Sequence, residues 1–140
     1  MASRQERRKY IRIDSRYVVR CERKTLTPSE TSRSVEAFTK NVSAEGMLFT
    51  SDFRYAVGDS LKVDLKLPGW KSFASGLALE GFSPAGDSQS MTGLVTRVEL
   101  LGDKTFDIGV HFTGTDKKVR WALMKYIYDF SGDEKNKRGN

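Results

Sequence analysis

Residues 61–69, LKVDLKLPG, decide the fold class of this chain. Leucine or valine occupies every odd position from 61 to 67, and lysine or aspartate occupies the even positions between them. This strict period of two predicts a β-strand with one buried face and one wet face, because successive side chains of a strand point to opposite sides. Pro68 and Gly69 end the strand, and Val57-Gly58-Asp59 supplies a turn before it.

The same alternation recurs along the chain in weaker form and predicts several short strands joined by turns. We expect these strands at 17–22, 34–42, 47–50, 73–82, 93–101 and 106–112, with a loop at 83–90 and a tight turn at 102–104. Val119, Leu123, Ile127 and Phe130 then recur at helical spacing. They predict a C-terminal helix with Thr115 as its N-cap, Asp116 in its first turn and Gly132 at its end. Together the elements indicate a small antiparallel barrel or sandwich whose open side the helix covers.

Positive charge is concentrated at the start of the chain. Residues 1–24 carry nine basic and three acidic side chains, a balance of +6 that equals the net charge of the whole protein. Much of this charge lies in RRKYIR, residues 7–12, ahead of the first predicted strand. A neutral domain with a basic arm favours a local anion or phosphate as its partner, and a solubilising tail is the alternative.

Several classes of protein are not expected. The length of 140 residues fits one domain, and a single cysteine, Cys21, cannot form an internal disulfide. Without a long apolar run or a signal sequence, a cytoplasmic location without membrane insertion is predicted. There is no Cys/His cluster, P-loop or carboxylate pair, and the one histidine, His111, falls on the polar side of a strand. We therefore predict no catalytic residue and no metal site, and the protein is not expected to be an enzyme.

The stretch NVSAEG, residues 41–46, is the second unusual feature. If the strand runs through Ser43, Asn41 and Ser43 project from one face about 7 Å apart, where they can read a base edge or hold a phosphate oxygen. Gly46 allows a positive φ or a close backbone approach. The alternative is a turn in which the Asn and Ser side chains bond their own backbone. Arg8 and Arg12 in an extended arm can spread up to about 13 Å, enough to hold both ends of a compact dianion.

The ordered pair Arg8-Lys9-Tyr10-Ile11-Arg12 and Asn41-Val42-Ser43-Ala44-Glu45-Gly46 resembles the PilZ domain, a bacterial receptor for cyclic di-GMP. The resemblance extends to 57–59, 61–68, 93–98 and 108–112 and covers roughly residues 7–130. It implies an all-β fold, a small six- or seven-stranded antiparallel barrel with one C-terminal α-helix. The implied organisation is a flexible basic arm at 1–13, the barrel and helix at 14–131 and a disordered tail at 132–140.

The resemblance also implies the ligand contacts. Guanine edges and phosphates would be bound by Arg7, Arg8, Arg12, Asn41, Ser43, Gly46 and Arg97. An arginine at position 7 goes with an intercalated dimer of the dinucleotide in the family, so we expect two ligands per domain and no other cofactor. Asp107 lies where some relatives carry a basic residue, so no ligand contact is expected there. Segment 70–90 is longer than expected, which suggests an extra hairpin, with Trp70 as a cap on a guanine or as an anchor packed on the barrel.

The leading hypothesis is a cyclic di-GMP receptor whose arm closes over the ligand and signals to an unidentified downstream protein. One alternative is a small barrel that binds RNA or single-stranded DNA. The mixed charges of Lys62, Asp64 and Lys66 argue against it, and a nucleic acid partner is not expected. A second alternative is a PilZ-like module that binds a protein and no ligand.

Overall fold

The computed structural model describes residues 16–24 and 34–139, with side chains as far as residue 129. Within these ranges the chain forms six strands and two helices. The strands are β1 (Val18–Arg23), β2 (Ser34–Val42), β3 (Gly46–Ser51), β4 (Ser60–Lys66), β5 (Ser88–Leu100) and β6 (Phe106–Thr113). The helices are α2 (Trp70–Gly76) and α3 (Lys117–Gly139).

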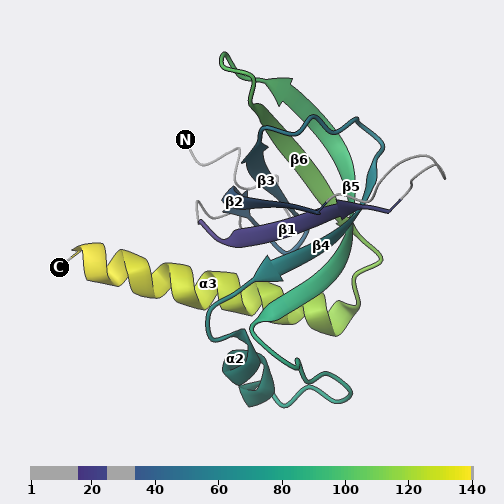
Figure 1. The fold of residues 1–140 in the computed structure, drawn as a ribbon. Helices are drawn as coiled ribbons and strands as arrows, with labels where there is room; N and C mark the ends of the chain where they lie inside the picture. The colour runs from purple at the N-terminus through teal and green to yellow at the C-terminus, as the bar shows by residue number, and fades with distance from the viewer. Residues whose placement is uncertain (1–15, 25–33, 140) are drawn as a thin grey trace, which may run out of the picture.

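The six strands form a closed barrel in the order β1-β2-β3-β6-β5-β4, and every neighbouring pair is antiparallel (Figure 1). The pairing of β4 with β1, in which Leu65 lies opposite Val19, closes the ring. The predicted all-β fold is therefore confirmed, with six strands, and the barrel rather than the sandwich is the architecture. Closure leaves the ring without an unpaired edge strand.

The period of two in β4 separates the core from the solvent as predicted. Leu61, Val63 and Leu65 are completely buried, and the side chains that alternate with them face outward. Full burial of each such side chain stabilises the fold by about 1.5–3 kcal/mol. Cys21 in β1 is also a core residue, and burial, with a smaller contribution from Asp64, raises the pKa of its thiol to about 12.

The segment after β4 differs from the prediction. Residues 73–82 were expected as a strand, but α2 forms at Trp70–Gly76, after Gly69 adopts a φ of 76°. Trp70 is completely buried, packs edge-on against Tyr126 at 5.5 Å between centroids and donates its indole N–H to Gln89 at 3.2 Å. The extra hairpin is therefore wrong, and Trp70 is an anchor in the core rather than a cap on a ligand.

Helix α3 lies along the barrel with its apolar face inward (Figure 1). Leu123 and Tyr126 are buried, and the Tyr126 hydroxyl donates to the Pro68 carbonyl at 2.6 Å. The predicted helix is confirmed, but its ends differ from the prediction. Asp116, not Thr115, caps its first turn by accepting a hydrogen bond from the Lys118 amide at 2.7 Å. The helix continues past Gly132 to Gly139, so the predicted end is wrong; whether the last residues are disordered in solution remains a prediction.

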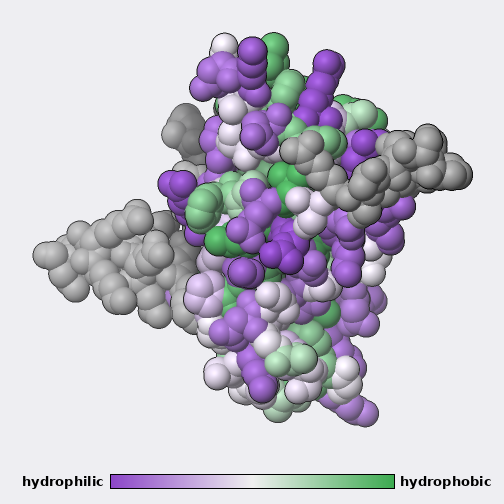
Figure 2. All heavy atoms as spheres, in the orientation of Figure 1, coloured by the Kyte–Doolittle hydropathy of each residue, from purple (hydrophilic) through white to green (hydrophobic). Residues whose placement is uncertain are grey.

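The surface is mostly hydrophilic. Figure 2 shows hydrophilic residues over most of one face, with the hydrophobic ones in small separate groups. The exposed large hydrophobic residues include Phe38 on β2, half of whose surface is accessible, and Trp121 and Tyr128 on α3. No helix in the described part of the chain is long and apolar enough to cross a membrane.

Candidate functional site

A β-bulge in β2 directs Asn41 out of the barrel. As far as Thr39, the odd-numbered residues of β2 face inward, whereas beyond the bulge the inward residue is Val42. The register with β3 shifts between Thr39 and Asn41, so Lys40 is the extra residue. A strand reverses its faces at such an insertion, because side chains alternate with a period of two. Lys40 and Asn41 consequently both face outward.

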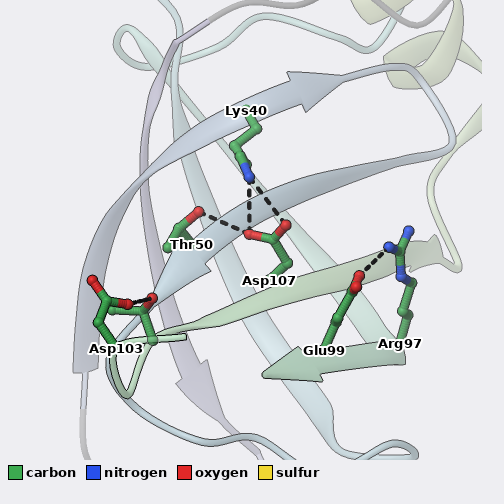
Figure 3. A network of polar contacts seen from close by, with 7 residues as sticks. Lys40, Thr50, Arg97, Glu99, Asp103 and Asp107 are labelled. Atoms are coloured by element: carbon green, nitrogen blue, oxygen red, sulfur yellow. Dashed lines mark hydrogen bonds and ion pairs between the residues drawn. The ribbon is translucent and has the colours of Figure 1, made fainter. Parts of the chain in front are cut away.

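A second bulge does the same for Arg97 in β5. Met91 and Val95 point into the barrel, and the register with β6 then shifts between Val95 and Arg97. Arg97 and Glu99 point outward and form an ion pair with each other (Figure 3). Arg97 therefore lies on the polar outer face together with Glu99.

The two redirected residues lie on one row across the barrel wall. Asn41 pairs with Leu48 of β3, Leu48 with Gly109 of β6, and Gly109 with Arg97 of β5. Adjacent strands are about 4.8 Å apart, so three steps separate Asn41 from Arg97 by at most roughly 14 Å. Between them lie Leu48, whose side chain faces outward, and Gly109, which has no side chain.

Ser43 does not share a face with Asn41 as predicted, because β2 ends at Val42 and Ser43 belongs to the following turn. Its hydroxyl accepts a hydrogen bond from the Glu45 amide at 3.1 Å, and its side chain is buried. For Ser43 the alternative interpretation, a hydroxyl that bonds its own turn, is therefore confirmed. The Asn41 carboxamide does not take part: within the described chain its Oδ1 atom is buried and accepts no hydrogen bond.

Gly46 is required by the packing of two strands. A Cβ added at this position would lie 2.3 Å from the carbonyl oxygen of Val110 in β6. Of the two expectations for Gly46, the positive φ is wrong, since Gly46 is not among the residues with positive φ. The close approach exists, and it is to the backbone of β6.

Two open grooves lie near Asn41, which lines neither of them: its chain neighbour Lys40 lines one, and its ladder partner Leu48 lines the other. One, of about 740 Å³, is lined by residues of β2 and the end of β3, including Arg16, Phe38 and Lys40. The other, of about 320 Å³, lies over β3, β6 and β5 and is lined by Gly46, Leu48, Arg97, Gly109 and His111 among others. Volumes of a few hundred Å³ are typical of small-molecule sites.

The sequence interpretation missed the polar residues beneath this face. Asp107 points outward but is almost fully covered, and it accepts hydrogen bonds from Lys40 and from Thr50 (Figure 3). No ligand contact was expected at Asp107, and its carboxylate is already paired within the protein. The sequence offers one signal for Lys40, its adjacency to Asn41. The pairing of Lys40 with Asp107 could not be predicted, because 67 residues separate the two partners.

Arg7, Arg8 and Arg12 lie outside the described residues, so their predicted roles remain predictions. The chain enters the described region at Arg16, whose guanidinium carbon lies 4.4 Å from the centroid of the Phe38 ring. The next residue, Tyr17, donates its amide to the Thr39 hydroxyl at 2.9 Å. The described part of the chain therefore begins beside β2, at the larger groove.

His111 is exposed on β6, as predicted, and lines the smaller groove. No group of three or more His, Cys, Asp or Glu side chains in the described ranges is arranged to hold a metal ion. Three ion pairs lie on the outside of the described barrel wall: Arg20 with Glu36, Lys40 with Asp107, and Arg97 with Glu99. This face is thus a mosaic of paired charges rather than a continuous basic strip.

The family model of the PilZ domain matches residues 4–129, and the chain belongs to the PilZ domain family. No curated protein sequence matches the chain. The sequence resemblance to this family is therefore confirmed over nearly its whole predicted extent.

Solved structures with similar folds are distant in sequence. One is the PilZ domain of YcgR from Escherichia coli with c-di-GMP, at 13% identity and a TM-score of 0.62, covering 96% of this chain and 98% of that one. The K. pneumonia MrkH–c-di-GMP complex has 14% identity and a TM-score of 0.65 over 93% of this chain and 55% of MrkH. The Bacillus subtilis inhibitor of motility MotI/DgrA has 17% identity and a TM-score of 0.62 over 90% of this chain. This chain spans only about half the length of the last protein, 52%.

Proposed function

We propose that this protein is a receptor for cyclic di-GMP that binds the dinucleotide on the outer face of β2, β3, β6 and β5. The observation that carries the proposal is the row on which two bulges direct Asn41 and Arg97 outward. A carboxamide can bond a guanine edge, and an arginine can bond a phosphate or a guanine edge. Membership of the PilZ family and the two similar folds solved with c-di-GMP support the same ligand.

The N-terminal arginines would complete the site. Four residues of extended chain reach up to roughly 13 Å, so Arg12 is within reach of the groove at Arg16 and Phe38. Arg8 and Arg12 supply guanidinium groups for the phosphates and guanines, and the arm closes over the ligand. Cyclic di-GMP must bind the closed arrangement more tightly than the open one for this closure to act as a signal. The closed arm then offers a new surface to an unidentified downstream protein in the cytoplasm.

Each remaining residue has a distinct proposed role. The Asn41 carboxamide, whose oxygen has no donor within the described chain, meets a guanine. Ser43 stabilises the turn that follows Asn41, and Gly46 allows the close contact of β3 with β6; both help to position the Asn41 side chain. Arg97 exchanges its ion pair with Glu99 for a contact with a phosphate. Arg7 adds a further guanidinium, and we propose an intercalated dimer of cyclic di-GMP, for which the two grooves near Asn41 offer room. No catalytic role is proposed.

Calorimetric titration of arginine variants tests the clamp. Arg8→Ala and Arg12→Ala each remove charge-assisted hydrogen bonds worth about 1.5–3 kcal/mol, so affinity should fall about 10- to 150-fold. Ser43→Ala should weaken binding less, because its hydroxyl bonds its own turn. Arg54→Ala is the control for loss of one positive charge, since Arg54 is exposed between β3 and β4 and lines neither groove. Normal affinity in both arm variants would refute the clamp.

The same titration with RNA separates the nucleic acid alternative. Binding of RNA depends steeply on salt when several phosphates are neutralised. The paired charges of the outer face favour a compact ligand over a long polyanion. We expect no salt-sensitive RNA binding at concentrations that saturate cyclic di-GMP, and tight RNA binding without dinucleotide binding would support the alternative.

A further inference from the structure

The bulge that turns Asn41 outward is held by a side chain from across the barrel wall. Lys40, the extra residue of the bulge, extends over β3 and donates to both carboxylate oxygens of Asp107 on β6, at 3.1 and 3.0 Å (Figure 3). Thr50 of β3 donates to the same carboxylate at 3.0 Å and lies directly opposite Asp107 in the ladder. Three strands, β2, β3 and β6, are thus joined by one buried carboxylate.

This contact lies where the backbone pairing of β2 with β3 is interrupted. An inserted residue interrupts the ladder of hydrogen bonds between two strands, and bulges often set the direction of a functional side chain. Here the interruption lies between Thr39 and Asn41. Asp107 is only 7% exposed, so its contact with the half-exposed Lys40 is better shielded from water than a surface ion pair.

We propose that Asp107 is a positioning residue for Asn41: through Lys40 it holds the bulge in one conformation and so fixes the direction of the Asn41 carboxamide. This inference rests on the proposed function, in which Asn41 contacts the ligand. Asp107 itself does not touch the ligand. Its effect on affinity passes through Asn41.

The hydrophobic pattern explains why loss of Asp107 should loosen the bulge without unfolding the barrel. Thr39 and Val42 are both buried. Their burial keeps the extra residue between them in the strand even when Lys40 has lost its partner. Lys40 is half exposed, so without Asp107 its ammonium can turn to solvent rather than remain buried and unpaired. On the other side Glu99 faces Asp107 across the β5–β6 ladder and has Arg97 as its own partner, so removal of Asp107 creates no new unpaired acid.

A double-mutant cycle tests the path of the effect. Asp107→Ala should weaken cyclic di-GMP binding about 5- to 10-fold by calorimetry, and Asp107→Asn, which keeps an acceptor for Lys40, by less. In an Asn41→Ala background, Asp107→Ala should change affinity less than twofold. Asp103→Asn, in the exposed turn between β5 and β6, is the control for a lost carboxylate and should bind normally. An equal loss from Asp107→Ala with and without Asn41 would overturn the inference.

Amide hydrogen exchange, followed by NMR without ligand, tests the same idea independently of the proposed function. In Asp107→Ala the amides of residues 40–42 should lose protection at least 5-fold, while that of Val63 in β4 should keep its wild-type value. Unchanged protection at 40–42 would overturn the positioning role. If exchange changes as expected but wild-type protein binds no cyclic di-GMP, the proposed function fails while the control of the bulge by Asp107 stands.

Discussion

The substitution Gly46→Ala should destabilise the barrel at the contact between β3 and β6. The added Cβ would lie 2.3 Å from the Val110 carbonyl oxygen, about 1.1 Å inside the 3.4 Å at which ordinary contact begins. The obstacle is backbone, so β3 and β6 must separate. The hydrogen bond that joins the two chain segments beside this point, from Phe112 N to the Glu45 carbonyl at 2.7 Å, would be stretched or lost.

The size of the effect follows from these contacts. One lost hydrogen bond costs about 1 kcal/mol, and overpacking adds about 1–3 kcal/mol where the structure cannot relax. We therefore expect the free energy of unfolding to fall by about 2–4 kcal/mol. For a chain of this length the entropy of unfolding is about 0.3 kcal/mol per degree, so the Tm should drop by roughly 7–14 °C.

Thermal unfolding followed by circular dichroism measures this drop. Gly86→Ala is the matched control, because a Cβ at Gly86 meets nothing within 4 Å and the residue has no positive φ. Its Tm should stay within about 2 °C of the wild-type value, since surface substitutions usually change stability by less than 0.5 kcal/mol. A Gly46→Ala protein as stable as the wild type would refute the close approach of β3 to β6.

Three further predictions concern other parts of the molecule. Glu99→Gln frees Arg97 from an exposed ion pair worth about 0.2–1 kcal/mol, so calorimetry should find cyclic di-GMP bound up to about 5-fold more tightly; weaker binding would contradict the proposed role of Arg97. The pKa of the Cys21 thiol, raised to about 12 by burial and then by Asp64, predicts reaction with Ellman's reagent at pH 8 at least 100-fold slower than in the unfolded chain, and similar rates would disprove the burial. Trp70→Ala should cost about 3–5 kcal/mol in urea unfolding and Trp121→Ala, on the exposed face of α3, less than 1 kcal/mol, so equal losses would contradict the packing of α2.

Strict periodicity made most of the barrel predictable. In β4 every odd residue is apolar, and the structure buries all of them. The predicted strand at 73–82 is wrong because two periods compete at its start. Trp70, Phe73, Ala74 and Leu77 have helical spacing, but Leu77 and Leu79 also alternate as in a strand. A seven-residue helix is too short for periodicity to decide between them.

The site was harder to predict than the fold because the alternation of side chains does not reveal where a strand contains an inserted residue. Sequence spacing placed Asn41 and Ser43 on one face, yet the strand ends between them. Asn41 faces outward because Lys40 is inserted before it, and the partner that holds Lys40 is on another strand. Such a contact depends on the register of three strands, which only the folded barrel establishes.

Titration of the 140-residue chain with cyclic di-GMP by calorimetry tests the central claim most directly. The PilZ domain of YcgR, which has been solved with c-di-GMP, serves as the positive control under the same conditions. We predict saturable binding with two dinucleotides per chain. One ligand per chain would contradict the intercalated dimer, and no saturable heat from a folded sample, while the control binds, would contradict the receptor function itself.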